Sequence, residues 1–376
     1  MDIFTRIEKP TLLLDVERAR ANIRQMAQKA SAQKVRFRPH FKTHQSATIG
    51  EWFAAEGVKA ITVSSVDMAR YFISYGWKDV TIAFPVNLRQ ISVIESLAQR
   101  ASLGLLVESV EVARVLGEKI RSAVSIWIKV DVGSHRTGLA HDAPQPFLSI
   151  ISELSRHSHL KLRGLLAHAG HSYRAINAAQ VCQTYSESVE RLLALRSALL
   201  AAGSPPLEIS VGDTPGCTLS PQLGPVDEIR PGNFVFYDVQ QLGVGACTPD
   251  QIAVALACPI VALHPEREIA VIYGGAIHLS KDTANWDGDH IYGLVALPNP
   301  TRQPGQPGWG EPLPGAYVAS LSQEHGLVHV PKPLMEQLHI GDLLCVLPVH
   351  SCLTAQAIGR YLTLEGERIL MMPLMG

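Results

Sequence analysis

The sequence carries no excess of charge of either sign. Its 376 residues include 33 Lys and Arg against 34 Asp and Glu, which leaves a formal net charge of -1 at pH 7. Surfaces that bind nucleic acid or an anionic membrane normally need a cationic excess. We therefore expect no nucleic acid and no membrane among the partners of this protein, and a small molecule as its ligand.

The sequence also lacks long apolar runs and a cysteine framework. One of the longest runs, residues 252–263, is interrupted by Pro259 and is shorter than the ~20 residues that cross a bilayer. The first ten residues have no apolar core of a secretory signal. The six cysteines are scattered between positions 182 and 352 and do not indicate a set of disulfides. A reducing, cytoplasmic location fits these absences best.

Between residues 16 and 245, short apolar runs alternate with longer segments of helical spacing. This alternation is typical of a parallel sheet built from βα units. The runs predicted to be strands are 35–40, 61–65, 80–84, 103–107, 125–131, 162–168, 207–211 and 233–238. Eight strands with helices between them, over about 230 residues, match an α/β fold of the (β/α)8 TIM-barrel type. A doubly wound open sheet is the alternative, but no GxGxxG motif follows the first strand.

The pattern changes after residue 245, where apolar runs are separated by Pro and Gly and show almost no helical period. Such a pattern predicts a second, all-β domain. The early run 11–15 has no place among the eight barrel strands, so we assign it to the same domain. The predicted organisation is a barrel of residues 16–245 and a β domain made of residues 1–15 and 246–376.

The first predicted barrel strand ends in the segment RPHFKTH. Strand alternation would place Arg38, His40 and Lys42 on one face, which points into a barrel. Three cationic groups buried together are costly unless an anion or a covalent adduct compensates them, and barrel enzymes bind ligands at this end of the strands. A desolvated lysine can offer its amine to a carbonyl cofactor, which makes Lys42 a candidate for Schiff-base chemistry. A solvated loop is the alternative interpretation.

A second candidate segment, SVGDTPG at residues 210–216, follows the seventh predicted strand. Small residues there allow backbone N–H groups to approach a phosphate, and barrels often bind phosphate after strands seven and eight. Taken alone, the segment is more typical of an ordinary Gly/Pro turn. Together with Lys42 it forms the arrangement that pyridoxal phosphate needs, with the aldehyde at one side and the phosphate at the other.

At these positions the sequence resembles the alanine-racemase-like, fold-type III pyridoxal-phosphate family. Within that family it resembles the metal-dependent D-serine dehydratase and D-threonine aldolase branch, which includes D-threo-3-hydroxyaspartate dehydratase. RPHFKTH is similar to the family's RPHxKTH segment, which implies that Lys42 carries the cofactor and that His40 lies in the cofactor site. KVDVGSHRTGL resembles a D-x-G-x-x-R-x-G stretch, which implies a position for Arg136 beside the cofactor ring. The resemblance spans nearly the whole chain.

Two further segments complete the implied barrel site. LLAHAGHSY is similar to the H-x-G-x-S-Y motif of the dehydratases, which implies that His168 and Tyr173 line the pocket. SVGDTP resembles SVGSTP, which implies phosphate contacts for Gly212 and Thr214.

The resemblance continues into the C-terminal part of the sequence. EIRPGNFVFYD is similar to a segment that would place Tyr237 and Asp238 near the phosphate. In VHSCLTA, His350 and Cys352 are two residues apart, so on a strand they would face the same side and could share a metal ion. Spacing alone favours the packing of a buried cysteine, but in this branch the matching residues bind a divalent metal. Imidazole with thiolate favours zinc. With only two protein ligands, water and substrate oxygens would complete the coordination.

A third C-terminal segment, SQEHGL, resembles an EHG loop of the family, in which Glu324 or His325 could orient a ligand or the substrate. A polar turn is the alternative. The sequence departs from the family pattern at two places: KPT at 9–11 replaces a Thr-Pro pair, and PVH before the cysteine replaces PNH. Residues 274–282 match the family only loosely, and none of them is assigned a role.

The resemblance implies a homodimeric lyase that depends on pyridoxal phosphate and zinc. Its expected reaction is dehydration of D-serine or a related D-3-hydroxyamino acid to a 2-oxo acid and ammonia. The main alternative is D-threonine aldolase chemistry, in which the Cα–Cβ bond breaks to give glycine and an aldehyde. A racemase, which would leave the metal pair without a task, and a non-catalytic pyridoxal-phosphate carrier are less favoured. The β substituent stays open, since Arg38, Arg136 or Arg174 could recognise an extra carboxylate.

Overall fold

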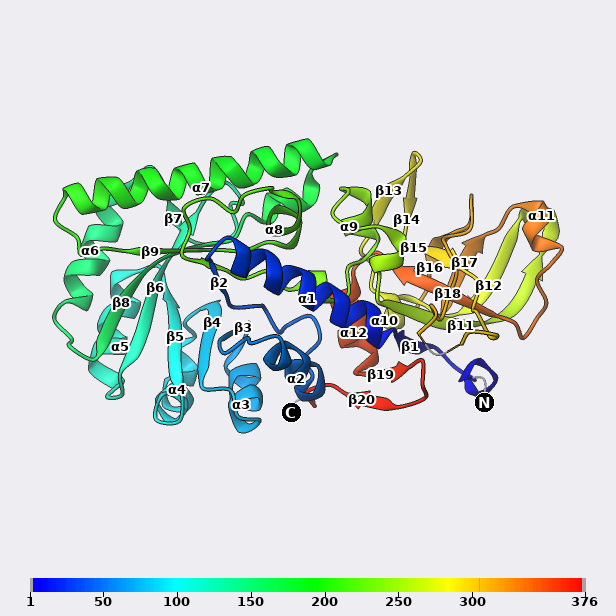
Figure 1. The fold of residues 1–376 in the computed structure, drawn as a ribbon, viewed down its shortest axis with the longest axis horizontal. Coiled ribbons are helices and arrows are strands. Elements are labelled where there is room, and N and C mark those ends of the chain that lie inside the picture. Colours follow the sequence, from blue (N-terminus) through cyan, green and yellow to red (C-terminus); the bar gives the residue numbers. More distant parts are fainter. Residues whose placement is uncertain (1–2, 304, 374–376) are drawn as a thin grey trace. The chain divides into compact units, whose positions relative to one another are not determined.

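The computed structural model describes residues 3–303 and 305–373, which divide into two compact units. One unit contains residues 25–232. The other combines the segment up to Arg24 with residues 233–373, so the boundary between the units falls within the sequence of helix α1 (Val16–Ala32; Figure 1). No helix of the described residues is both long and apolar enough to cross a membrane.

The first unit is a parallel barrel, which confirms the predicted fold class. Its strands follow the order β2-β10-β9-β8-β6-β5-β4-β3. A parallel bridge between His40 and Thr62 joins the ends of this order, with the amide of Thr62 donating to Pro39 O at 2.9 Å. The bounds are β2 (Arg36–Phe37), β3 (Ile61–Val63), β4 (Asp79–Pro85), β5 (Ser102–Val107), β6 (Val124–Asp131), β8 (Leu160–Ala167), β9 (Glu208–Val211) and β10 (Glu228–Ile229), with β7 (Leu139–Ala140) beside β6.

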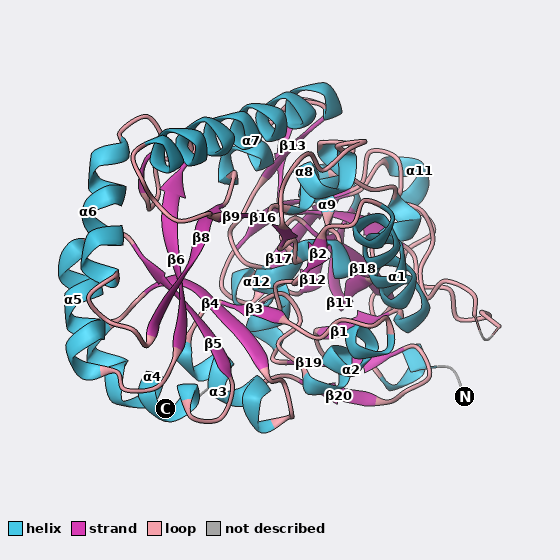
Figure 2. Cartoon of the chain, turned by 60° about the vertical axis from the view of Figure 1, so that its left-hand side comes forward, coloured by secondary structure: helices cyan, strands magenta, loops and turns pink. Residues whose placement is uncertain are grey.

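Helices cover the outside of these strands, as Figure 2 shows for β4, β5, β6 and β8. Several of them begin at the residue types that accept hydrogen bonds from a free helix N-terminus. Ser65, Ser109 and Asn177 cap α3, α5 and α7 in this way. The bounds are α2 (Ala47–Ala55), α3 (Val66–Ser74), α4 (Ile91–Ala98), α5 (Val110–Lys119), α6 (Pro144–Leu154), α7 (Ala178–Ala201) and α8 (Thr214–Leu219).

The predicted eighth strand is wrong in its position. The structure forms β10 from Glu228–Ile229, and the segment predicted as a strand begins with the 3-10 turn η4 (Asn233–Val235). Two features exclude a strand there. Pro231 and Gly232 separate the segment from β10, and Tyr237 has a φ of 49°, in the left-handed region. The run is apolar because its side chains are buried, and burial does not distinguish a strand from a turn.

The second unit is built on an antiparallel sheet that closes into a barrel. The strand order is β12-β17-β16-β15-β18-β11-β1-β19-β20, and β12 also pairs with β11. The eleven-residue strand β11 pairs with β1 and β18 and also with β12, where the register shifts between Ile260 and Ala262. The bounds are β1 (Thr11–Leu14), β11 (Val254–His264), β12 (Ile269–Tyr273), β15 (Gly293–Ala296), β16 (Tyr317–Leu321), β17 (His325–His329), β18 (Leu343–Pro348), β19 (Arg360–Thr363) and β20 (Arg368–Leu370).

Short elements complete this unit and carry its candidate site. They are a hairpin of β13 (Ala284–Trp286) and β14 (Asp289–Ile291), and the helices α9 (Val239–Gly243), α10 (Ala276–Leu279), α11 (Lys332–Met335) and α12 (Ser351–Ile358). Helix α12 begins three residues after β18 ends. His350 therefore lies in the β18–α12 connection, and Cys352 lies in the first turn of α12.

Candidate active-site residues in the two units

The segment that carries Lys42 is a turn, not the end of a strand. Strand β2 stops at Phe37, His40 forms its single bridge, and residues 41–44 turn. Phe41 anchors this turn, since its buried ring packs against Phe53 at a centroid distance of 4.9 Å. Lys42, the next residue, stays exposed. The turn thus presents an amine at the end of the barrel where the first strand finishes.

Arg38 is buried against two carboxylates and Lys42 is exposed, so the expectation of three uncompensated cationic groups buried together is wrong. Its guanidinium lies 2.7 Å from Glu228 and 2.6 Å from Asp79. Burial would lower the pKa of Arg38, but these two carboxylates raise it above its ordinary value. Because Arg38 is already compensated, its burial requires neither an anion nor a covalent adduct.

His40 and His168 are held as neutral imidazoles. Burial, and after it the charge of Lys42, lowers the pKa of both rings well below the ordinary value. His168 follows β8, and its Nδ1 bonds to the carbonyl oxygen of Gly212. A carbonyl only accepts, so Nδ1 carries the proton and Nε2 keeps its lone pair. The structure therefore brings Lys42, His40 and His168 within electrostatic reach of one another.

The predicted phosphate segment is tied to the segment that carries Tyr173. The amide of Thr214 donates to Tyr173 Oη at 3.1 Å, and Ser172 Oγ lies 3.1 Å from Asp213 Oδ2. Asp213 also caps α8 by accepting from the amide of Gly216 at 3.2 Å. Together with the His168–Gly212 contact, these bonds place all four predicted residues of the two segments in one cluster.

Gly212 is required by a close approach of two chain segments. A Cβ added there would lie 2.7 Å from the carbonyl carbon of Arg230, a distance that real Cβ atoms essentially never show. A side chain at 212 would therefore push β9 away from the segment after β10. The glycine keeps the loop against the barrel wall, where its carbonyl meets His168.

Sequence reasoning missed two buried cations of the barrel. Arg230 donates to Ser210 Oγ at 2.7 Å and to Ala167 O at 2.5 Å, and burial lowers its pKa to about 10. Burial, together with the charges of Arg230 and Arg136, lowers the pKa of Lys129 to about 7. Arg136 itself is exposed. The sequence offered one signal for Lys129, which lies inside the apolar run SIWIKVD. A lysine is rare in a buried strand, so its presence there indicates a special role.

In the second unit, His350 and Cys352 meet at the start of a helix. The predicted strand geometry is wrong here, because β18 ends at Pro348 and His350 is the N-cap residue of α12. Burial would lower the pKa of His350, but a hydrogen bond with Cys352 and the charges of Cys352 and Asp238 raise it to about 10. The first helical turn therefore brings the two side chains together, as strand alternation would have done.

Asp282 orients the imidazole of His350. Its Oδ2 lies 2.6 Å from His350 Nδ1, so Nδ1 donates to the carboxylate, and Nε2 would bind a metal in place of its proton. Asp282 belongs to the stretch 274–282, to which the sequence assigned no role. Among residues 3–303 and 305–373, no three His, Cys, Asp or Glu side chains form a group that could hold a metal ion. The pair thus offers one nitrogen and one sulfur.

The structure gives Tyr237 and Asp238 buried positions. Asp238 caps α9 by accepting from the amide of Gln241 at 3.0 Å, and its other oxygen accepts from the amide of Ser351 at 3.0 Å. Tyr237 is also buried. Their contact with a phosphate stays a prediction. The contacts of Asp238 connect it to α12, the helix that carries Cys352.

The EHG segment packs against α10. The carbonyl of Glu324 accepts from the amide of Gly274 at 3.0 Å, and its carboxylate lies 4.0 Å from His278 Nε2. His325 begins β17 and is exposed. A role for either residue toward a ligand stays a prediction.

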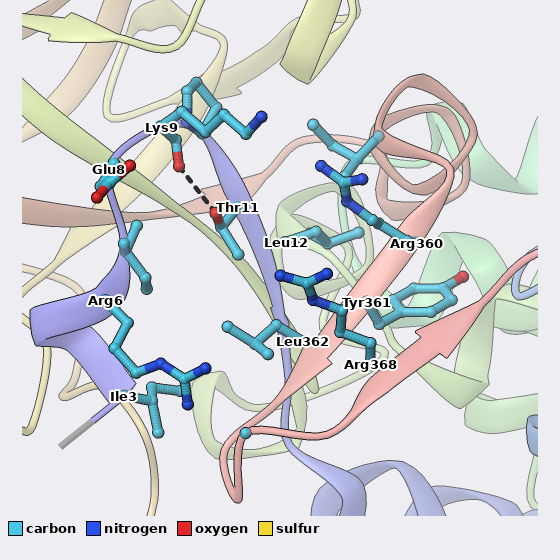
Figure 3. A pocket seen from close by; sticks show the side chains of 14 residues that line it. Ile3, Arg6, Glu8, Lys9, Thr11, Leu12, Arg360, Tyr361, Leu362 and Arg368 are labelled. Atoms are coloured by element: carbon cyan, nitrogen blue, oxygen red, sulfur yellow. Dashed lines mark hydrogen bonds between the residues drawn. The ribbon is translucent and has the colours of Figure 1, made fainter. Parts of the chain in front are cut away.

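A cavity of about 320 Å³ opens in the second unit between residues 3–12 and the strands β19 and β20 (Figure 3). Four basic side chains line it, from Arg6, Lys9, Arg360 and Arg368. None of the predicted site residues lines this cavity. It is therefore distinct from the site around His350.

Comparison with known proteins gives family matches over both units. The sequence matches the family described as alanine racemase, N-terminal domain, over residues 14–239, and a serine dehydratase domain over residues 253–364. It is 29% identical to the D-threo-3-hydroxyaspartate dehydratase of Delftia sp. (strain HT23), over 97% of this chain and 96% of the relative. It is 24% identical to the D-serine dehydratase of Dictyostelium discoideum, over 97% and 95%. The D-threonine aldolase of Arthrobacter sp. is 25% identical, over 93% and 87%.

Solved structures show the same fold. The Delftia dehydratase superposes with a TM-score of 0.89 at 26% identity, over 99% of each chain. A cysteine-to-alanine variant of that dehydratase, described as metal-free, gives a TM-score of 0.88 at 26% identity over 97% of each chain. Because the first family match covers more than half of the sequence, the chain belongs to the alanine-racemase-like family of fold-type III pyridoxal-phosphate enzymes.

Proposed function

We propose that this chain is a pyridoxal-phosphate- and metal-dependent dehydratase of D-3-hydroxyamino acids, which releases a 2-oxo acid and ammonia. The observation that carries the proposal is that one chain combines Lys42, flanked by two neutral imidazoles, with a His350–Cys352 pair oriented by Asp282. The named dehydratases that it resembles over nearly its whole length support the reaction class. We further propose that it acts as a homodimer and uses zinc.

The basic groups of the barrel unit fit pyridoxal phosphate, which is an anion with an aldehyde. Lys42, Lys129, Arg136 and Arg230 all act on the imidazoles or on one another there, and they lower the pKa values of their neighbours. An anionic ligand would relieve this repulsion. Lys42 would hold the aldehyde carbon, and the Gly212 and Thr214 segment would hold the phosphate. When bound, the cofactor supplies an electron sink for the substrate's α-carbon.

Proton movement would fall to Lys42 and its neutral neighbours. An amine takes a proton from carbon only when it is itself unprotonated. His168 cannot donate the proton on Nδ1 to the substrate, because that N–H is hydrogen-bonded to the carbonyl oxygen of Gly212. Its Nε2 lone pair can instead accept a hydrogen bond from the substrate or from the lysine.

The pair in the second unit fits a borderline-soft divalent metal such as zinc. A thiolate and an imidazole nitrogen are zinc ligands, and the carboxylate on the far side of the ring fixes the tautomer in the way common at metal sites. Such a metal, when bound, supplies a Lewis acid that makes a hydroxyl group a better leaving group. Cys352 and His350 would hold it, and water or substrate oxygen would fill the remaining positions.

The ion pairs in the structure reduce the number of arginines that could bind an additional carboxylate of the substrate. Arg38 is already paired with Glu228 and Asp79, which removes it from consideration. Arg136 and Arg174 are exposed and remain candidates. A β-carboxylate on the substrate is supported by the 29% identical relative, which is named for hydroxyaspartate.

Product analysis with a panel of D-3-hydroxyamino acids tests the proposal. We expect pyruvate and ammonia from D-serine, 2-oxobutanoate from D-threonine, and no turnover of the L-enantiomers. The alternative, retro-aldol cleavage, is favoured by the match to a D-threonine aldolase. Glycine and acetaldehyde as the main products from D-threonine would establish the aldolase and refute the dehydratase.

A further inference from the structure

A buried amide lies beneath the first turn of α12. Asn233 Nδ2 is 2.6 Å from Asp238 Oδ2, 3.1 Å from Ser351 Oγ and 3.7 Å from Cys352 Sγ. Asn233 is only 6% exposed, so its N–H groups cannot turn to water. An amide nitrogen donates and does not accept. Asn233 therefore offers a hydrogen bond to the sulfur of the predicted metal ligand.

We propose that Asn233 is a positioning residue for metal binding. Its amide N–H donates to Cys352 Sγ and directs the sulfur at the metal, and Asp238 holds Asn233. This inference rests on the metal site of the proposed function, and adds to it a residue that sets the metal affinity.

Asp238 determines which way the amide of Asn233 faces. Both carboxylate oxygens accept from backbone amides, Oδ1 from Gln241 and Oδ2 from Ser351. An amide oxygen placed at 2.6 Å from Oδ2 would meet a second acceptor, so the nitrogen must face the carboxylate. The two N–H groups then serve Asp238 on one side and, on the other, Ser351 Oγ and Cys352 Sγ. The amide oxygen of Asn233 has no hydrogen-bond partner among the described residues, so no hydrogen bond to that oxygen opposes this orientation of the amide.

Asp238 also leaves the ring of His350 available. His350 is the N-cap residue of α12, yet its side chain makes no capping bond. The amide of Ser351 finds its acceptor in Asp238 instead. The imidazole is thereby left to Asp282 and to a metal.

The contact matters because Cys352 is buried. A thiolate that is 8% exposed has lost most of its hydration and needs donors in place of water. An N–H donor lowers that cost and fixes the direction of the sulfur lone pairs. Outer partners of metal ligands commonly change metal affinity by about 10–100-fold when they are removed.

The test compares metal binding by the wild-type chain and by Asn233→Ala. Zinc affinity is measured by competition with a chromogenic chelator, and the thiolate-to-metal charge-transfer band is measured after loading with Co²⁺. We expect Asn233→Ala to bind zinc about 10–100-fold more weakly. We also expect its cobalt band to move to lower energy, because the thiolate loses a donor. A merely structural role would not move that band.

Gln241→Met is the matched control. Gln241 is a fully buried amide on the same helix as Asp238, and neither amide atom of its side chain has a partner among the described residues. Its replacement should leave both readouts unchanged. Far-UV circular dichroism establishes that the variants fold, and Asn233→Leu, which fills the space without a donor, replaces the alanine variant if that one does not.

The outcomes separate the two proposals. If the cobalt-loaded wild type shows no thiolate band, the metal site of the proposed function is wrong. If the wild type shows the band while folded Asn233→Ala or Asn233→Leu binds as tightly with the same band, the metal site stands and the role of Asn233 is refuted.

Discussion

At the scale of single residues, the site depends on groups that the fold keeps uncharged. His40 and His168 are neutral in a region that also holds Lys42 and the buried Arg230. Cations exclude one another when they are desolvated together, so the barrel keeps some of its basic groups unprotonated. Lone pairs on the two imidazoles are the chemical result.

Lys42→Ala should abolish the cofactor's visible absorption and reduce turnover by at least about 10²-fold, because the covalent attachment and the proton-transferring amine are both lost. Absorption spectra before and after borohydride reduction, followed by peptide mapping, give the measurement. Lys129→Met is the control, since Lys129 is a buried barrel lysine whose pKa is lowered to about 7. A reducible adduct that persists on Lys129 in Lys42→Ala would move the assignment to that residue.

His44 provides a test of the turn through pH. It is fully buried beside Phe41, and burial lowers its pKa to about 3 from an ordinary value of 6.5. Above pH 6.5 both folded and unfolded states are neutral at this ring, so its contribution is constant. As pH falls below 6.5 only the unfolded chain takes up the proton, and by pH 5 the folded state should lose about 2 kcal/mol. Urea denaturation at pH 7 and pH 5 measures this loss.

His44→Phe removes the titration while keeping an aromatic ring in the cluster. Between pH 7 and pH 5, the free energy of unfolding of this variant should therefore fall by about 2 kcal/mol less than that of the wild type. Equal losses in the two proteins would show that the buried ring of His44 does not govern acid stability.

At the scale of elements, the candidate functional residues lie in or beside the connections between strands and helices. The neighbouring elements determine the conformation of each connection. Lys42 lies in the turn after β2, and Gly212 lies between β9 and α8. Thr214 begins α8, and Cys352 lies in the first turn of α12. Hydrogen bonds between connections hold them in place, as when the amide of Thr214 donates to Tyr173. A change in backbone position at one connection should therefore shift the connection to which it is hydrogen-bonded.

Gly212→Ala should destabilise the protein by about 1–3 kcal/mol and weaken cofactor binding, because the new Cβ would overlap the backbone of Arg230. Gly170→Ala is the control in the same cluster, since a Cβ there would lie 3.5 Å from His168, an ordinary contact. Urea denaturation and a titration with pyridoxal phosphate measure the two effects. Equal stability of the two variants would contradict the close approach.

The sequence predicted the parallel barrel, the β domain and the candidate residues, because apolar alternation and motif spacing are local properties of the chain. It did not predict which connections would be strands. The run 233–238 was assigned to a strand since its side chains are apolar, and nothing local reveals that Tyr237 takes a left-handed φ. His350 and Cys352 were placed on a strand for the same reason, although a helix begins there.

The sequence also could not predict contacts between residues that lie far apart in the chain. Glu228 and Asp79, which compensate Arg38, lie 190 and 41 residues from it. Asp282 lies 68 residues from His350. Such pairs depend on the final packing, so spacing along the chain could neither exclude Arg38 from the site nor find Asp282.

At the scale of the whole molecule, the two kinds of chemistry reside in different compact units. Lys42, the two imidazoles and the Gly212 segment lie in residues 25–232, whereas the His350–Cys352 pair and its supporting residues lie in residues 233–373. The barrel residues that would bind the cofactor contact one another through bonds that involve no metal ligand. Loss of the metal and loss of the cofactor should therefore be separable.

A chelator should abolish dehydration of D-serine while the cofactor stays bound, and added zinc should restore activity. The reason is that departure of the β-hydroxyl needs a Lewis acid, whereas attachment of the cofactor needs only the Lys42 amine and the phosphate segment. The measurement is turnover with the visible spectrum and the zinc content of the same sample. Cys352→Ala should reproduce the chelated state permanently, and Cys182→Ala, at a cysteine on the barrel helix α7, should change nothing. If Cys352→Ala retained full metal content and full activity, the metal would have to bind elsewhere, and the Lewis-acid role of this pair would be lost.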